Sequence, residues 1–380
     1  MIDQEQLDKL VNLRHRLHQN PELSGQEKHT IDLLCRYLDG IHPDILKVRI
    51  GKGLLFIFDG KADGPTTMIR AELDALPIEE KLELSYQSTN PGVSHKCGHD
   101  GHMCMVLGLA NSLYEKPPAK GRVILLFQSA EETGQGAHWM LEDSEFKKYQ
   151  PDYAFALHNL PGHEMGQVLI KEGTFCAASV GMKIELKGHT AHASHPENGK
   201  SPATAMSRLA TLIVNIPQAE GAFQDFALAT LTHMHLGEPT FGVSPGEGEM
   251  RFTLRAYQDR DLEMLKSLIK TETERIAAEE GLEVFFTFHE AFDATVNHSD
   301  GANLTKSVAE EQELSHEVMS EPNRWSEDFG LFLQHSKGAM FGLGSGLQLP
   351  ALHHPDYDFP DELIETGLKM FWGVLQRLYY

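Results

Sequence analysis

The stretch Val123-Ile-Leu-Leu-Phe-Gln-Ser-Ala-Glu-Glu132 decides the fold. It begins with five apolar residues in a row, which is typical of a short strand buried on both faces of a sheet. Similar apolar runs occupy residues 53–58 and 67–70, and residues 102–113 have the pattern of a helix rich in small residues. Because strands alternate with helices here, the sequence predicts an open α/β sheet.

The middle of the chain follows a different pattern. Strands and helices are expected there in the order βαββαβ, at residues 180–186, 202–213, 226–233, 249–257, 260–280 and 282–289. This order is one complete split-βαβ unit, a ferredoxin-like α+β fold. The length of 380 residues also favours two domains. We therefore predict that residues 1–176 and 292–380 form an α/β/α catalytic domain around a mixed sheet, and that residues 177–291 are an inserted domain.

Composition narrows the class of protein. The chain has 55 acidic and 33 basic residues, a net charge of -22, which argues against nucleic acid or an anionic membrane as a partner. No apolar run is long enough to span a membrane, and the first ten residues lack the apolar core of a signal peptide. The cysteines show neither CxxC spacing nor the density of a disulfide scaffold, so we expect a cytoplasmic protein with free thiols.

One short segment concentrates metal-ligating residue types. His95-Lys-Cys-Gly-His-Asp-Gly-His102 contains one cysteine, three histidines and two glycines. Thiolate and imidazole groups suit zinc and neighbouring transition metals. The alternative interpretation is a polar turn before a helix. We expect Cys104, on that helix, to be a core thiol.

Acidic residues follow two of the predicted strands. Glu72 and Asp74 lie two positions apart and therefore point to the same side of the chain. Glu131 and Glu132 are adjacent, so we expect them on opposite sides, one to bind a metal ion and the other to move a proton. Taken alone, either pair is compatible with an ordinary acidic loop.

Histidines follow two further segments of the chain. His158 follows the apolar run 153–157, and His353 and His354 follow a glycine-rich stretch. A lone histidine such as His158 is more often satisfied structurally. Combined with the other segments, however, the sequence offers one cysteine, one glutamate and three histidines, a sensible ligand set for two divalent ions.

These segments together resemble a known family. The chain is similar to the two-metal, zinc-peptidase-like amidohydrolases related to aminoacylase, hippurate hydrolase, the plant auxin-conjugate hydrolases and the N-acetyl-diaminopimelate deacetylases. The resemblance runs nearly end to end, through residues 17–23, 70–77, 97–102, 131–132, 158–159 and 352–359. The segments Cys97-Gly-His-Asp-Gly-His102 and Glu131-Glu132 are the most specific to that family.

The resemblance implies roles for these residues. The implied metal ligands are Cys97, His99, Glu132, His158 and His353, with His354 as the alternative to His353. Glu131 would be the general base, and Asp74 would orient it or a ligating histidine. Asn159 is implied as a substrate-binding residue.

The resemblance also implies a role for the inserted domain, as a lid or dimerisation domain. In Lys187-Gly-His-Thr-Ala-His-Ala-Ser-His195, His192 would polarise the scissile carbonyl, in many relatives from the partner subunit. Arg255 would grip a substrate carboxylate. The alternatives are a solvated histidine-rich turn and an ordinary surface arginine. Two departures put substrate recognition in doubt: Gly242 stands where many relatives have asparagine, and Glu72 where they usually have aspartate.

The predicted function is metal-dependent hydrolysis of the amide bond of small N-acyl amino acids. The cofactors would be two divalent ions of manganese, zinc, cobalt or nickel. We expect a homodimer or homotetramer acting on a small molecule. Two alternatives stay open: a dipeptidase or aminopeptidase on the same scaffold, and an inactive metal-binding protein.

Overall fold

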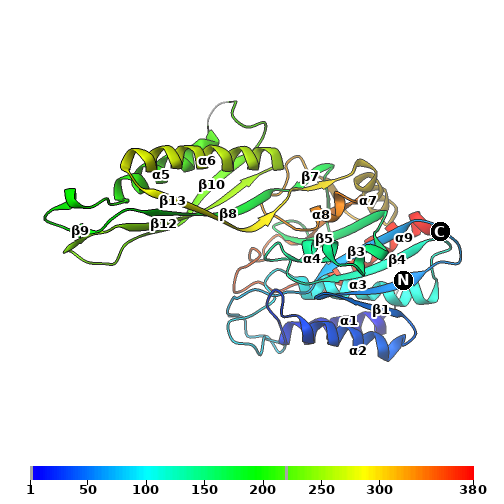
Figure 1. The fold of residues 1–380 in the computed structure, drawn as a ribbon. Helices are drawn as coiled ribbons and strands as arrows, with labels where there is room; N and C mark the ends of the chain where they lie inside the picture. The colour runs from blue at the N-terminus through cyan, green and yellow to red at the C-terminus, as the bar shows by residue number, and fades with distance from the viewer. Residues whose placement is uncertain (1–2, 219–220) are drawn as a thin grey trace. The chain divides into compact units, whose positions relative to one another are not determined.

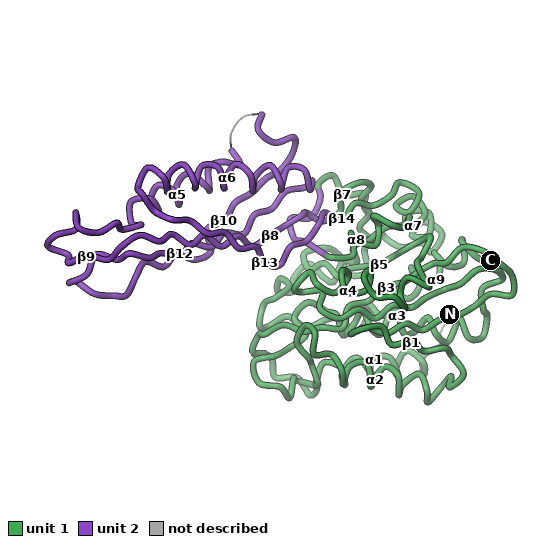
Figure 2. The backbone as a smooth tube through the Cα atoms, in the orientation of Figure 1, with its two compact units in different colours: residues 1–175, 295–321, 328–380 green, residues 176–294, 322–327 purple. Residues whose placement is uncertain are grey.

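The computed structural model describes residues 3–218 and 221–380. The chain divides into two compact units, coloured separately in Figure 2. Unit 1 comprises Met1–Phe175, Thr295–Glu321 and Asp328–Tyr380, and unit 2 comprises Cys176–Ala294 and Pro322–Glu327. The predicted insert, 177–291, lies inside unit 2.

An eight-stranded mixed sheet forms the centre of unit 1 (Figure 1). Its strand order is β1-β2-β4-β3-β5-β16-β6-β15, with the bounds β1 Leu46–Ile50, β2 Gly53–Asp59, β4 Arg122–Gln128, β3 Thr66–Glu72, β5 Tyr153–Pro161, β16 Lys337–Gly346, β6 Val168–Ile170 and β15 His316–Val318. The neighbours β4, β3, β5 and β16 run parallel, whereas β2 is antiparallel to β4. The predicted mixed α/β sheet is therefore confirmed.

Helices cover both faces of this sheet. On one face α3 (His99–Glu115) packs against α1 (Gln4–Gln19) and α9 (Leu363–Tyr379). The same apolar core takes in residues of α2 (Lys28–Ile41) and α7 (Ser299–Glu311), and it includes the buried thiol of Cys104, as predicted. The short helices α4 (Gly136–Glu142) and α8 (Gly330–Leu333) contact β4 and β16. A 3-10 turn at Phe146–Tyr149 and a two-stranded sheet of β7 (Gly173–Cys176) and β14 (Thr295–Asn297) complete unit 1.

Unit 2 is an antiparallel sheet with two helices on one face. The sheet order is β10-β12-β8-β13, with the bounds β10 Ala227–Leu236, β12 Glu247–Ala256, β8 Ala178–Lys187 and β13 Glu283–Phe292. Alternate residues of β8, such as Met182 and Ile184, pack against α5 (Ala203–Asn215) and α6 (Asp259–Glu280). Setting aside the two-residue strands β9 (Ala191–His192) and β11 (Val243–Ser244) and the 3-10 turns Pro196–Asn198 and Ile216–Gln218, the chain order is the predicted βαββαβ.

No helix within residues 3–218 and 221–380 combines the length and the apolar character that a membrane crossing requires.

Candidate metal centre

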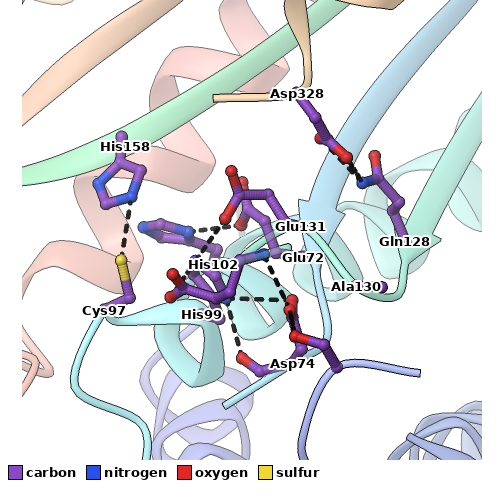
Figure 3. Close-up of polar contacts among 12 residues, drawn as sticks. Glu72, Asp74, Cys97, His99, His102, Gln128, Ala130, Glu131, His158 and Asp328 are labelled. Carbon is purple, nitrogen blue, oxygen red and sulfur yellow. Dashed lines mark hydrogen bonds and ion pairs between the residues drawn. The ribbon is translucent and has the colours of Figure 1, made fainter. Parts of the chain in front are cut away.

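The predicted ligands Cys97, His99 and His158 lie together at one edge of the large sheet (Figure 3), and Glu132 and His353 belong to donor groups that share members with them. Strands β3, β4 and β5 run parallel, so their carboxyl ends lie at the same edge, the usual place for a site in an open α/β sheet. Asp74 follows β3, Glu131 follows β4, and His158 belongs to β5. The helix α3 begins at the same edge with His99.

The turn before α3 requires glycine at position 98. Gly98 has φ +90°, and a Cβ atom there would lie 2.5 Å from the side-chain oxygen of Asn159. Only a glycine tolerates both conditions. This turn places the Cys97 thiol on one side and the His99 ring on the other, within reach of a common ion (Figure 3).

Backbone carbonyls fix the tautomers of two histidines. His99 Nδ1 lies 2.9 Å from the Asp74 carbonyl, and His158 Nδ1 lies 2.9 Å from the Asn159 carbonyl. A carbonyl only accepts, so in the neutral form of both rings Nδ1 carries the proton and Nε2 has the lone pair. His158 Nε2 lies 3.4 Å from Cys97 Sγ. Both rings therefore present a metal-ligating nitrogen toward the site.

Glu131 and Glu132 point to the same site, so the prediction that they face opposite sides is wrong. His99 Nε2 lies 3.9 Å from a carboxylate oxygen of each. The alternation of a strand no longer applies because β4 ends at Gln128 and Ala130 adopts a left-handed backbone with φ +54°. The backbone N–H of Glu132 donates to the Asp74 carboxylate at 3.0 Å.

Of the two adjacent histidines, His353 is the one at the site. Its Nε2 atom lies 3.6 Å from the Glu132 carboxylate, and its backbone N–H donates to the Lys96 carbonyl at 2.8 Å. His353 has φ +65°, and its side chain is half exposed at the margin of the site. The ring of His354 instead faces Asp356, at 3.8 Å.

The donors fall into overlapping groups, each compact enough to hold one ion. Three groups matter here, and within each the ligand atoms lie within 4.8 Å of one another: Cys97, His99 and His158; Cys97, Glu132 and His353; His99, Glu131 and Glu132. Shared ligands between groups are what a two-metal site requires.

The electrostatics of this cluster call for cations. Burial alone would lower the pKa of His99, but the hydrogen bond to Asp74 and the charges of Glu72 and Glu132 raise it to about 10. Burial, Glu132 and Glu131 all raise the pKa of the Cys97 thiol. His99 Nε2 is buried with no hydrogen-bond partner in the described structure. A divalent ion would satisfy this nitrogen and offset the carboxylate charge, so the residues fit metal ions.

A second row of polar residues supports the ligands and was not predicted from the sequence. His102 Nδ1 donates to Glu72 at 2.6 Å, and its Nε2 contacts the side-chain oxygen of Asn159 at 2.6 Å. The Asn159 amide in turn donates to the Tyr357 hydroxyl at 2.5 Å. Both nitrogens of His102 are therefore engaged. Asn159 has no exposed surface, and its predicted contact with substrate stays a prediction.

Glu72 also joins a buried ion pair. Arg70 contacts Glu72 and donates to Asp328 at 2.7 Å and to Gln128 at 3.0 Å. Burial alone would raise the pKa of Glu72, but the charges of Arg70 and His102 hold it well below its usual range. The three histidines of residues 95–102 are a signal that could have indicated His102; no comparable signal marks Tyr357 or Asp328.

The segment 95–102, which carries Cys97 and His99, also contributes to a second buried cluster. We call this cluster the anchor network, and it consists of Arg14, His18, Glu80, Lys96 and Asp100. Asp100 accepts from Arg14 Nε at 3.1 Å and from His18 Nδ1 at 2.8 Å. Glu80 accepts from His18 Nε2 at 2.8 Å and from Lys96. Burial alone would lower the pKa of His18, but Asp100 and Glu80 raise it to about 9.

The two predicted site residues of unit 2 are described within that unit. His192 is exposed on β9, and the backbone N–H of Ser194 donates to its Nδ1 at 3.1 Å. In the neutral ring the proton then resides on Nε2, which becomes a hydrogen-bond donor. Arg255 donates to the Arg324 carbonyl at 2.9 Å and contacts the Ser326 hydroxyl at 3.0 Å. The predicted roles of His192 and Arg255 stay predictions.

Known proteins share both the sequence and the fold. The chain is 32% identical over 372 residues to an N-acetyl-L-cysteine deacetylase of Bacillus subtilis, which covers 97% of this chain and 88% of the relative. It is 30% identical to a hippurate hydrolase of Campylobacter jejuni, with 94% of each chain covered. A solved dinuclear metal binding peptidase of family M20 from Bacillus subtilis superposes with a TM-score of 0.83 at 26% identity, over 99% of both chains.

The family match extends over most of the chain. Residues 68–377 match Peptidase family M20/M25/M40, a span that includes every predicted metal ligand. The family resemblance inferred from the sequence is confirmed, and so is its prediction of a hydrolase. The chain belongs to Peptidase family M20/M25/M40.

Proposed function

We propose that this protein is a metal-dependent amidohydrolase that cleaves the amide bond of small N-acyl amino acids. The observation that carries the proposal is the position of His99 Nε2. Its lone pair is buried, aimed between Glu131 and Glu132, and 3.9 Å from each carboxylate. That arrangement suits an ion between an imidazole and a carboxylate, with the second carboxylate beside it for proton transfer.

We assign the ligands as two groups. Cys97, His99 and His158 would hold one ion, and Glu132 and His353 would hold the other, with Cys97 or His99 close enough to be shared. Two divalent ions held there would supply a water with a pKa near neutrality. Manganese, zinc, cobalt and nickel all suit this mixture of thiolate, imidazole and carboxylate.

In the proposed reaction Glu131 moves the proton. It accepts a proton from the attacking water as the oxygen bonds to the amide carbon, and it delivers that proton to the nitrogen as the C–N bond breaks. The products are a carboxylic acid and an amino acid. Asp74 holds His99 and Glu132 in place, because its carbonyl accepts from the His99 ring and its carboxylate accepts from the Glu132 N–H.

Unit 2 would complete the reaction. We propose that the Nε2–H of His192 donates a hydrogen bond to the oxyanion that forms on the carbonyl oxygen, and one such donor typically contributes about 10²–10³ in rate. Arg255 would bind the substrate carboxylate, and unit 2 would act as a lid or mediate assembly into a homodimer or homotetramer. Light scattering on the purified protein tests the assembly.

The names of the relatives support the substrate class. Two of the relatives are called an N-acetyl-L-cysteine deacetylase and a hippurate hydrolase, and in both compounds an acyl group is attached to an amino acid. An aminopeptidase or dipeptidase activity is the second candidate and the less favoured one, because a solved aminopeptidase of Bacillus cereus is only 14% identical and shares the fold alone, with a TM-score of 0.73.

The test is a substrate panel with controlled metal content. The protein is stripped with a chelator, reloaded with manganese or zinc, and assayed on acetyl, benzoyl and indole-acetyl amino acids and on unblocked dipeptides. We expect hydrolysis of acyl amino acids that disappears on chelation and returns on metal addition. Faster cleavage of unblocked dipeptides would favour the second candidate, and no cleavage by fully loaded protein would contradict both.

A further inference from the structure

The loop between α1 and α2 reaches both acidic segments of the metal centre. Ser24 Oγ donates to the Asp74 carboxylate at 2.7 Å, and the Ala75 N–H donates to the Glu22 carbonyl at 2.8 Å. At the end of the loop, Glu27 extends in the direction of the segment that carries Glu131 and Glu132.

Glu27 binds the backbone next to these two carboxylates. Its Oε1 atom accepts from the Ala130 N–H at 2.8 Å and from the Gly25 N–H at 2.8 Å. Glu27 and Ala130 are both buried, with exposed fractions of 2% and 0%. Water therefore cannot replace this acceptor, and loss of Glu27 would leave the Ala130 N–H buried without a partner.

The Ala130 backbone needs such support. Its φ of +54° lies in the left-handed region, which is unfavourable for a residue that has a Cβ atom. The Ala130 carbonyl accepts from the Gly136 N–H at 3.0 Å, which closes the turn on its other side. The left-handed residue sets the direction in which the chain continues, and so it places both Glu131 and Glu132 beside His99.

We propose that Glu27 is a positioning residue for the hydrolytic reaction: by accepting from the Ala130 N–H, it holds the left-handed turn that directs Glu131 and Glu132 into the metal centre. This inference rests on the proposed function. It requires a hydrogen-bond acceptor at position 27 and does not require a charge. Burial raises the pKa of Glu27 to about 7, with a further contribution from Asp74, so a neutral amide suits the same environment.

The experiment compares Glu27→Ala with Glu27→Gln in the metal-loaded protein. We expect Glu27→Ala to lower kcat on an acyl amino acid by about 10–100-fold with KM changed less than about 3-fold, because the carboxylates lose their placement. Glu27→Gln retains an acceptor oxygen and should keep kcat within about 5-fold of the wild type. If Glu27→Ala does not fold, Glu27→Asp is the replacement variant. Its side chain is one methylene group shorter, so its carboxylate lies farther from the Ala130 N–H, and kcat should again fall.

A double mutant tests the route through the backbone. Glycine has no Cβ atom and adopts positive φ freely, so Ala130→Gly in the Glu27→Ala background should recover about 3–10-fold of the lost kcat. The matched control is Glu22→Gln in the same loop. Among the described residues, its carboxylate accepts from His29 N, Thr30 N and Thr30 Oγ1 at the start of α2 and from no group of the metal centre, so kcat should be unchanged.

Amide hydrogen exchange separates this inference from the proposed function, because it needs no substrate. A peptide spanning residues 128–136 should exchange faster in Glu27→Ala than in the wild type and should keep its protection in Glu27→Gln. Unchanged exchange, an unchanged kcat in Glu27→Ala, or equal damage in Glu27→Ala and Glu27→Gln would overturn the positioning role. If the variants show the expected differences in exchange but the wild type hydrolyses no amide, only the proposed function is overturned.

Discussion

The metal centre and the anchor network are two polar clusters that meet in residues 95–102, which contribute side chains to both. Cys97 and His99 face the metal centre, whereas Lys96 and Asp100 face the anchor network. In the anchor network each of the two carboxylates, Glu80 and Asp100, lies against two cationic side chains. In the metal centre Asp74, Glu131 and Glu132 surround His99, whose Nε2 is buried with no hydrogen-bond partner among the described residues.

The clusters differ in charge pairing, because one buried oxygen of Asp100 also has no hydrogen-bond partner among the described residues. A buried charge is tolerated only when it is paired or coordinates a metal. The anchor network forms its ion pairs within the protein, and these pairs hold the segment 95–102 in place. The metal centre depends on ions from solution, so its chemistry and its stability should both respond to metal. Four experiments test this difference between the metal centre and the anchor network, beginning with the one for which we expect the largest effect.

The largest effect should follow from Glu131→Gln. The amide occupies the same volume but cannot accept the proton from water, so kcat should fall by about 10²–10⁴-fold. Metal analysis should show the same ion content as the wild type, because Glu132 remains. A near-normal kcat would remove Glu131 as the base, and loss of an ion would make it a ligand.

Arg14→Met should break the anchor network. Arg14 donates to Asp100 at 3.1 Å, to Asp358 at 2.7 Å and to Asp361 at 2.9 Å, and its loss leaves Asp100 buried beside fewer cations. Removing one partner of a buried pair typically costs about 3–5 kcal/mol, measured here by urea unfolding. In the same helix, Lys9→Met removes an exposed pair with Glu5 and should leave the free energy of unfolding nearly unchanged. Equal costs would contradict the contrast.

The anchor network should also make stability depend on pH. The pKa of His18 is raised from 6.5 to about 9, so its charged form stabilises the folded state below about pH 6.5. That contribution, on the order of 3 kcal/mol, is lost as the pH rises through 9. We expect the unfolding free energy of the metal-free protein to fall across this range more steeply than that of metal-free His18→Gln. Both proteins retain His99, whose raised pKa contributes equally to each. Parallel curves would show that His18 is not charged in the fold.

The smallest effect distinguishes the two adjacent histidines. His353→Ala should weaken binding of one ion by about 10–100-fold, measured by metal titration, because Nε2 leaves the group with Cys97 and Glu132. His354→Ala should bind metal like the wild type, because its ring faces Asp356. The opposite result would transfer the ligand role to His354.

Much of this could be predicted from sequence because the signals are local. The apolar run 123–127 and the strand-helix order of residues 180–289 depend on periodicity alone, and the structure confirms both. The segment 95–102 combines ligand types that have few other uses so close together. The identity of the family followed from segments like these.

The parts that could not be predicted depend on contacts between distant segments. The shared orientation of Glu131 and Glu132 follows from the left-handed Ala130, which Glu27 stabilises from 103 residues away. Tyr357 meets Asn159 across 198 residues. Nothing in the local pattern around either residue indicates such a partner, so only the folded chain reveals it.

The hydrogen bond from the His353 N–H to the Lys96 carbonyl joins segments that leave the ribosome at different times. At about 5–20 residues per second, roughly 10–50 s separate their synthesis. Cys97, His99 and His158 all emerge before unit 2, whereas His353 emerges after it. During that interval the nascent chain contains all the residues of two of the three donor groups, and only the group with Cys97, Glu132 and His353 is incomplete. The group that includes His353 would therefore be the last to come together, when the final segment docks against Lys96.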